Sequence, residues 1–209
     1  MESSSQSPHA GVLLYSGCTI AEVIELVTRL ADAQIRVVFA GAGSEVITDR
    51  SGLQLRPDAS VEDLDSAALD VVIVPGGDPE AIIGDPRVAR LLSSVANSGG
   101  LIAGICAGVL VMGSAGLLRG RSITHNYRAP WAPPEISAVV ERFWEDAQVE
   151  PDPSVGVVVD GQVITALPNA TIEFAMTVCR RLGVYGTDRA AQLGRYLRGE
   201  HVAELHDYG

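Results

Sequence analysis

The stretch Leu101-Ile-Ala-Gly-Ile-Cys106-Ala-Gly108 joins an uninterrupted apolar run to a cysteine that stands between two glycines. Residues 101–105 carry no polar side chain, which predicts a strand buried on both faces of a sheet. Residues 107–118 predict the helix that follows. Gly104 and Gly108 permit a sharp turn between strand and helix. The stretch therefore predicts an α/β unit that presents Cys106 at the carboxyl end of its strand.

The same alternation of strand and helix patterns continues outward in both directions. Predicted strands cover residues 11–15, 35–40 and 71–74, with hairpins at 45–48/53–56 and 155–159/162–166. Predicted helices cover 19–33, 107–118, 170–182 and 187–198, a short one opens at 60–63, and another begins at Asp85-Pro86. Apolar strands separated by helices predict a single α/β domain, with a mainly parallel sheet sandwiched between helices. We expect a disordered tail at 1–10, the domain at 11–183 and a helical extension at 184–209, with 128–134 as the longest loop.

Composition excludes several classes of function. The 209 residues are 47% hydrophobic, enough for one compact core. Fifteen basic against 26 acidic residues give a net charge of −11, which argues against a nucleic-acid partner. All the basic residues are arginine. Without lysine, neither a Schiff base nor a phosphate-binding GxxxxGK loop can form, which excludes pyridoxal-phosphate enzymes and lysine aldolases.

Membrane insertion and export are not expected. Residues 101–118 carry no charge and are long enough to span a bilayer, but four glycines interrupt them, and a buried strand followed by a helix explains them equally well. Residues 1–10 are polar and contain no apolar signal core. Three cysteines, Cys18, Cys106 and Cys179, do not form a disulfide framework. The sequence therefore predicts a cytoplasmic protein.

Cys106 is the strongest candidate for chemistry. The turn would expose its side chain, and the positive end of the following helix would lower the thiol pKa and favour the nucleophilic thiolate. The alternative is a small buried core cysteine.

Other candidates lie at the carboxyl ends of neighbouring predicted strands. Glu22 would reach the same sheet edge as Cys106 and hold a proton or orient water, but Thr19-x-x-Glu22 is also a capping box. The N–H groups of Gly76 and Gly77, with that of Ala107, would face an oxyanion, although the glycines also suit a plain loop.

Histidines and the remaining cysteines give weaker signals. His125 would serve as a base near Cys106 or as a hydrogen-bonded structural histidine. Cys18 follows the first strand without a motif, and Cys179 is expected in the core. The other histidines are expected in exposed tails: His9, His201 and His206. These residues form no zinc pattern, and we expect neither a metal nor another cofactor.

Together these pieces resemble the ThiJ/PfpI (DJ-one) superfamily over about residues 11–183. The matching stretches are Gly11-Val-Leu-Leu-Tyr-Ser-Gly17 with Glu22, Asp70-Val-Val-Ile-Val-Pro-Gly-Gly77, Leu101–Gly108, Ala115-Gly-Leu-Leu-Arg-Gly-Arg-Ser-Ile-Thr-His125 and Leu167-Pro-Asn-Ala-Thr-Ile-Glu-Phe-Ala175. The resemblance implies a fold like that of flavodoxin and class I glutamine amidotransferases. It also implies that Cys106 is the reactive cysteine, that Glu22 contacts it, and that Gly77 and Ala107 supply the oxyanion donors. A homodimer with the site near its interface is implied as well.

Departures from the superfamily's sequence pattern reduce the number of activities that the resemblance allows. Ala107 stands where the peptidase branch has histidine, which argues against that activity. Isonitrile hydratases carry threonine at that position and, in well-known members, aspartate where this chain has Glu22. Residues 116–125 nevertheless look closer to the hydratase branch. The late His-x-Glu of glutamine amidotransferases is missing, and a chain of 209 residues with a net charge of −11 leaves no room for the DNA-binding domain of the regulator branch.

The leading hypothesis is a cysteine-dependent enzyme that acts on a small molecule and adds water to an electrophilic carbon. Hydration of an isonitrile to an N-formamide comes first, and glyoxalase-type conversion of a 2-oxoaldehyde to a hydroxy acid follows closely. A redox sensor that oxidises the thiolate to sulfinate is the alternative from another class. A cysteine α/β-hydrolase would need a late acid and histidine, for which only Asp188 with His201 or His206 is available.

Overall fold

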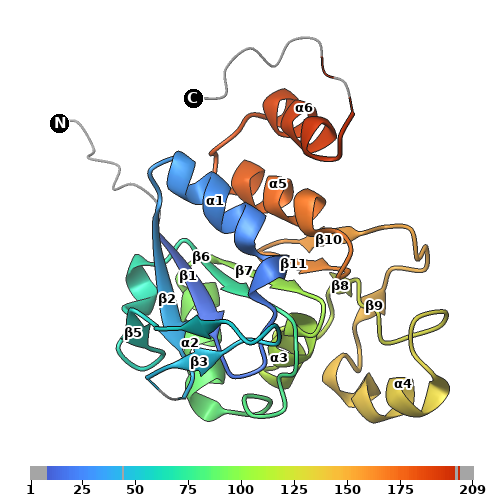
Figure 1. Cartoon of the computed structure of the whole chain (residues 1–209). Coiled ribbons are helices and arrows are strands. Elements are labelled where there is room, and N and C mark those ends of the chain that lie inside the picture. The colour runs from blue at the N-terminus through green and yellow to red at the C-terminus, as the bar shows by residue number, and fades with distance from the viewer. Residues whose placement is uncertain (1–8, 44, 201, 203–209) are drawn as a thin grey trace.

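A seven-stranded sheet forms the centre of the protein in the computed structural model, which describes residues 9–43, 45–200 and 202 (Figure 1). The strand order is β10-β11-β7-β6-β1-β2-β5. The bounds are β1 His9–Leu14, β2 Arg36–Gly41, β5 Ala59–Ser60, β6 Val71–Val74, β7 Leu101–Ile105, β10 Val157–Asp160 and β11 Val163–Ala166. All neighbours pair in parallel except β10 and β11. The predicted mainly parallel sheet is therefore confirmed, with the predicted hairpin at one edge.

Helices cover both faces of this sheet. Figure 1 shows α1 and α5 together on one face, α2 and α3 on the other, and α6 outside α5. The bounds are α1 Ile24–Asp32, α2 Pro86–Asn97, α3 Gly108–Ser114, α4 Pro134–Val140, α5 Thr171–Arg181 and α6 Thr187–Leu197, with 3-10 helices η1 Ile20–Glu22, η2 Ser66–Ala68 and η3 Glu141–Phe143. Asp85 caps α2 as predicted, because its carboxylate accepts a 2.8 Å hydrogen bond from the Arg87 N–H. Two small sheets lie outside the core: β3 Ile47–Thr48 with β4 Gln54–Leu55, and β8 Ser122–Ile123 with β9 Gln148–Val149.

The order of the strands identifies the sheet edge at which folds of this kind bind ligands. The chain runs from β1 outward to β2, and then returns to place β6 and β7 on the other side of β1. In such sheets the loops after the two strands at this reversal point diverge and leave a crevice at the carboxyl edge. The segments that follow β1, β6 and β7 carry Glu22, Gly76-Gly77 and Cys106, so the topology gathers the candidate residues there.

Five local predictions differ from the structure. The single helix expected at 19–33 divides at Val23 into η1 Ile20–Glu22 and α1 Ile24–Asp32. The first strand begins at His9, so His9 belongs to the sheet and not to a tail. At residues 60–63 the Ser60 hydroxyl donates to the Asp63 carboxylate over 2.7 Å, but a turn forms in place of a helix. The helix after Cys106 ends at Ser114, before Gly116, whose φ of +76° leaves the helical region. Finally, residues 134–143 form α4 and η3 directly after the predicted loop, where no helix was predicted.

The uncharged run at 101–118 divides into β7 and α3, which are both buried in the core. Within the described ranges, no helix combines the length and apolarity needed to cross a membrane.

Candidate active site

Cys106 lies in the turn between β7 and α3. Its φ is +55°, in the left-handed region that residues other than glycine seldom adopt. The surrounding structure holds this conformation: the Cys106 N–H donates to the Ala166 carbonyl of β11 over 2.9 Å. A conformation of this kind costs about 1–3 kcal/mol and tends to occur at functional sites. The half-buried side chain leaves the sheet edge as the sequence predicted.

Glu22 reaches this cysteine from η1, the short 3-10 helix after β1. Its carboxylate accepts a 2.8 Å hydrogen bond from the Gly76 N–H and another hydrogen bond from the Cys106 thiol. Burial raises the pKa of Glu22, and these two hydrogen bonds oppose that rise. Thr19 makes no side-chain capping bond, so the capping-box alternative does not form. Glu22 instead connects the loops that follow three different strands.

The thiol pKa is the opposite of the sequence prediction. Burial is the largest effect, and together with the charge and hydrogen bond of Glu22 it raises the pKa of Cys106 to about 12. Hydrogen bonds from the Ala107 and Gly77 N–H groups act in the other direction but are outweighed. The prediction of a lowered thiol pKa is therefore wrong, although the Ala107 N–H at the helix N-terminus acts in the predicted direction. The proton therefore stays on the sulfur, in the hydrogen bond to Glu22, and the carboxylate is placed to accept it.

The two glycines after β6 have different tasks. The Gly76 N–H is engaged by Glu22, so its predicted role as an oxyanion donor is wrong. A side chain at Gly76 would not fit, because a Cβ there would lie 2.6 Å from that of Cys106. The Gly77 N–H is directed at the Cys106 sulfur together with that of Ala107. These two groups can stabilise negative charge that develops on or beside the sulfur.

Tyr15 supports this arrangement, and the sequence reasoning assigned it no role. Its buried hydroxyl lies 2.8 Å from the Pro75 carbonyl and 2.7 Å from the Gly76 carbonyl, and donates to this turn. Cys18 is also buried and forms an isolated β-bridge with Gly77. The loop after β1 is thereby fixed to the loop after β6. The sequence signal that could have identified Tyr15 is an aromatic residue with a hydroxyl group at the end of a buried strand.

His125 packs into the segment after β8. Its ring stacks on Trp144 with centroids 4.1 Å apart, and its Nδ1 accepts a 3.1 Å hydrogen bond from the Tyr127 N–H. Burial and the Arg128 charge lower its pKa to about 4, so the ring is neutral at neutral pH. These contacts fit the alternative in which His125 is a hydrogen-bonded structural histidine. Its role as a base near Cys106 stays a prediction. Cys179 lies in the core, as expected, within α5, while His201 and His206 lie outside the described residues.

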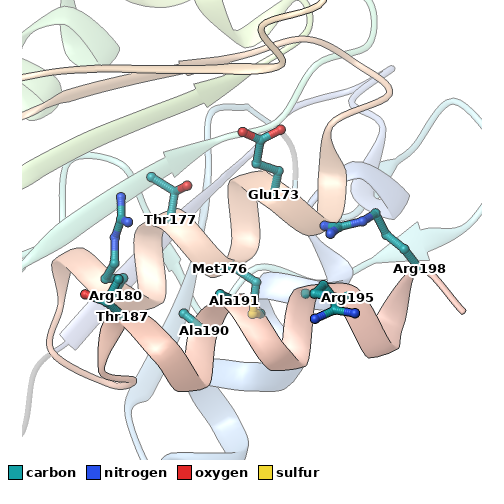
Figure 2. Close-up of a pocket in the computed structure, with 10 residues that line it drawn as sticks. Glu173, Met176, Thr177, Arg180, Thr187, Ala190, Ala191, Arg195 and Arg198 are labelled. Atoms are coloured by element: carbon teal, nitrogen blue, oxygen red, sulfur yellow. The ribbon is translucent and has the colours of Figure 1, made fainter. Parts of the chain in front are cut away.

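Two cavities differ in what they contain. One of about 960 Å³ lies beside the candidate site and is lined by Gly17, Gly77 and Tyr127 among others. Burial and the charges of Cys106 and Glu22 raise the pKa of Tyr127, which places this side chain close to the pair. A smaller cavity of about 410 Å³ lies between α5 and α6 (Figure 2) and contains none of the candidate residues.

Comparison with known proteins identifies relatives of this chain. The chain is 29% identical to the glutathione-independent glyoxalase DJR-1.2 of Caenorhabditis elegans, over 78% of this chain and 83% of that protein. It is also 29% identical to the isonitrile hydratase of Pseudomonas putida, over 81% and 68% of the two chains. The crystal structure of Drosophila melanogaster DJ-1beta superposes with a TM-score of 0.74 at 29% identity, covering 94% of this chain and all of that one. The model of the DJ-1/PfpI family matches residues 9–181, and the chain belongs to this family.

Proposed function

We propose that the protein is a cysteine-dependent enzyme that adds water to an electrophilic carbon of a small molecule. The hydrogen bond between the Cys106 thiol and the Glu22 carboxylate carries this proposal. It pairs a nucleophile with a base, and the Gly77 and Ala107 N–H groups next to the sulfur stabilise charge that develops there. Relatives named as an isonitrile hydratase and a glyoxalase support the same class of chemistry.

Hydration of an isonitrile is the first candidate reaction. The sulfur of Cys106 attacks the terminal isonitrile carbon while its proton passes to Glu22. Return of that proton to the carbon gives a thioimidate, R–N=CH–S–Cys. Glu22 then takes a proton from water as the water adds to this carbon, and the nitrogen is protonated. Breaking the C–S bond releases R–NH–CHO and the free thiol, so that one water is consumed in each cycle.

Conversion of a 2-oxoaldehyde is the second candidate, and the two N–H groups at the sulfur favour it. Attack on the aldehyde gives a hemithioacetal whose oxygen the Gly77 and Ala107 N–H groups can hold. Glu22 moves the C1 proton to C2 through an enediol, which leaves a thioester. Water hydrolyses this thioester to R–CH(OH)–COOH and restores the thiol.

A turnover screen with isonitriles and 2-oxoaldehydes tests the proposal. We expect Cys106→Ser to lower kcat by about 10³-fold or more, since it removes the nucleophile, while the circular dichroism spectrum stays unchanged. Cys179→Ser is the matched control, because that thiol lies in the core. Full activity of the Cys106→Ser protein contradicts the mechanism. Absence of turnover, together with selective double oxidation of Cys106 by mild peroxide, indicates a redox protein in place of this enzyme.

A homodimer is also proposed, as the family resemblance implies. Ile24 at the start of α1 is 51% exposed and Leu53 at the β3–β4 hairpin is 55% exposed, so both offer apolar contacts near the site. The Gly17 N–H donates to the Thr48 carbonyl over 2.9 Å and ties that hairpin to the loop after β1. Light scattering should give a dimeric mass that Ile24→Asp with Leu53→Asp reduces to that of a monomer. A monomeric mass for the unaltered protein contradicts this proposal.

A further inference from the structure

The cavity beside the candidate site has one markedly apolar side. Its lining includes Leu110 of α3, Ile136, Val139 and Val140 of α4, and Phe143 of η3. Val139 is 63% exposed and Ile136 is 46% exposed, although both are large aliphatic side chains. Neighbouring apolar side chains exposed in a concave site mark a surface that a ligand covers. We call Ile136, Val139 and Phe143 the apolar wall.

Charged side chains line the same cavity. Arg50, Asp78, Glu80 and Arg142 contribute to the lining. The charge of Arg50 lowers the pKa of Glu22, which places this guanidinium within electrostatic range of the catalytic pair. Gly77, whose N–H faces the Cys106 sulfur, and Tyr127 line the cavity as well, so it borders the candidate site although Cys106 and Glu22 are not among its lining residues.

The volume of the cavity distinguishes small substrates from those that carry a large apolar group. At about 960 Å³ the cavity lies near the upper end of the range for sites that hold drug-sized ligands, roughly 300–1,000 Å³. A three-carbon oxoaldehyde placed at Cys106 would leave the apolar wall exposed to water. An aryl group or an alkyl chain of several carbons, attached to the reacting carbon, would cover it.

We propose that the substrate carries an aryl or longer alkyl substituent, which packs against Ile136, Val139 and Phe143 while its electrophilic carbon faces Cys106. This inference rests on the proposed function and specifies its substrate class. Arg142 holds one side of the wall in place, because its guanidinium lies 4.9 Å from the centroid of the Phe143 ring.

Two homologous series test the proposal through turnover: n-alkyl isonitriles and n-alkylglyoxals, each from methyl to hexyl. For whichever class reacts, kcat/KM should rise about two- to fourfold for each added methylene, as expected for an apolar chain leaving water for a partly open wall. The double variant Ile136→Ser with Val139→Ser should flatten this dependence. Tyr196→Ser, which alters an exposed aromatic residue of α6, should leave it unchanged. A methyl substrate turned over as efficiently as the hexyl one overturns the proposal.

A binding measurement separates failure of this inference from failure of the proposed function. Calorimetry compares hexanamide with acetamide in the Cys106→Ser background, where no reaction is needed. Hexanamide should bind about tenfold or more tightly than acetamide, and the double variant should lose that difference. Equal affinities, no detectable binding of hexanamide, or a difference that survives in the double variant each overturn the proposal even if turnover is found. Preserved binding without turnover supports the apolar wall and counts against the proposed reaction.

Discussion

The Glu22 carboxylate accepts the hydrogen of the Cys106 thiol, although the two residues come from opposite sides of the reversal point in the sheet. Burial raises the pKa of both groups. The charge and hydrogen bond of Glu22 raise the pKa of Cys106 further, while the hydrogen bond from the thiol opposes the rise at Glu22. The pair therefore holds a single proton over a wide range of pH. Neither residue alone has this property, and the consequences below follow from it.

The first prediction concerns the pH dependence of alkylation of Cys106 by iodoacetamide. In the unaltered protein the rate should rise as Glu22 loses its proton, with an apparent pKa above the ordinary 4.5 of that group, because only the carboxylate can accept the thiol hydrogen. In Glu22→Gln this rise should move to the ionisation of the thiol itself, at about pH 8.5 or above. Mass spectrometry of the labelled peptide isolates Cys106 from the buried Cys18 and Cys179. Identical profiles for the two proteins would show that Glu22 is not the base.

The second prediction concerns Gly76→Ala. The new Cβ would lie 2.6 Å from the Cys106 Cβ and 2.9 Å from the Ala107 nitrogen, so the loop must move and the Glu22–Cys106 hydrogen bond with it. We expect kcat/KM to fall about 100-fold, the scale of loss that a displacement of about 1 Å produces in an active site. Gly186→Ala is the control, because a Cβ there meets no atom within 4 Å. An active Gly76→Ala enzyme would contradict the close packing of these loops.

The elements that could be predicted from the sequence are those set by local pattern. Val71–Val74 and Leu101–Ile105 have the predicted bounds, because an unbroken apolar run fits only a strand covered on both faces. The turn at Cys106 was equally visible in its flanking glycines. Asp85 with Pro86 specified the start of α2 through a cap and a fixed φ.

The remaining features depend on contacts between distant segments. Whether the Gly76 N–H faces a ligand or Glu22 depends on how the loops after β1 and β6 dock, which neither loop encodes alone. The direction of the Cys106 pKa shift could not be predicted from the sequence, because it depends on how deeply three loops together bury the thiol. The helix Pro134–Val140 follows a proline-rich loop, and its exposed Ile136 and Val139 gave no core-facing pattern.

The third prediction concerns Tyr15→Phe. Loss of the hydroxyl leaves the buried Pro75 and Gly76 carbonyls without this donor, which should lower the free energy of unfolding by about 1–3 kcal/mol. Urea denaturation measures the change. Tyr185→Phe is the matched control: its hydroxyl hydrogen-bonds Arg29 at a half-buried position away from the site, and its removal should cost less. Equal losses in the two variants would show that Tyr15 does not brace the turn after β6.

The fourth prediction links His125 to acid stability. Its pKa of about 4 in the folded protein lies below its ordinary value of 6.5, so between these pH values the unfolded chain binds a proton that the folded protein does not. Stability from this group is complete above pH 6.5 and falls as the pH drops toward 4, by about 3 kcal/mol at most. His125→Gln should remove this slope from urea midpoints measured at successive pH values, whatever its effect at neutral pH. Arg128→Gln should reduce the slope, because the Arg128 charge contributes to the lowered pKa. An unchanged slope in His125→Gln would mean that the imidazole accepts a proton as readily in the folded protein as in the unfolded chain.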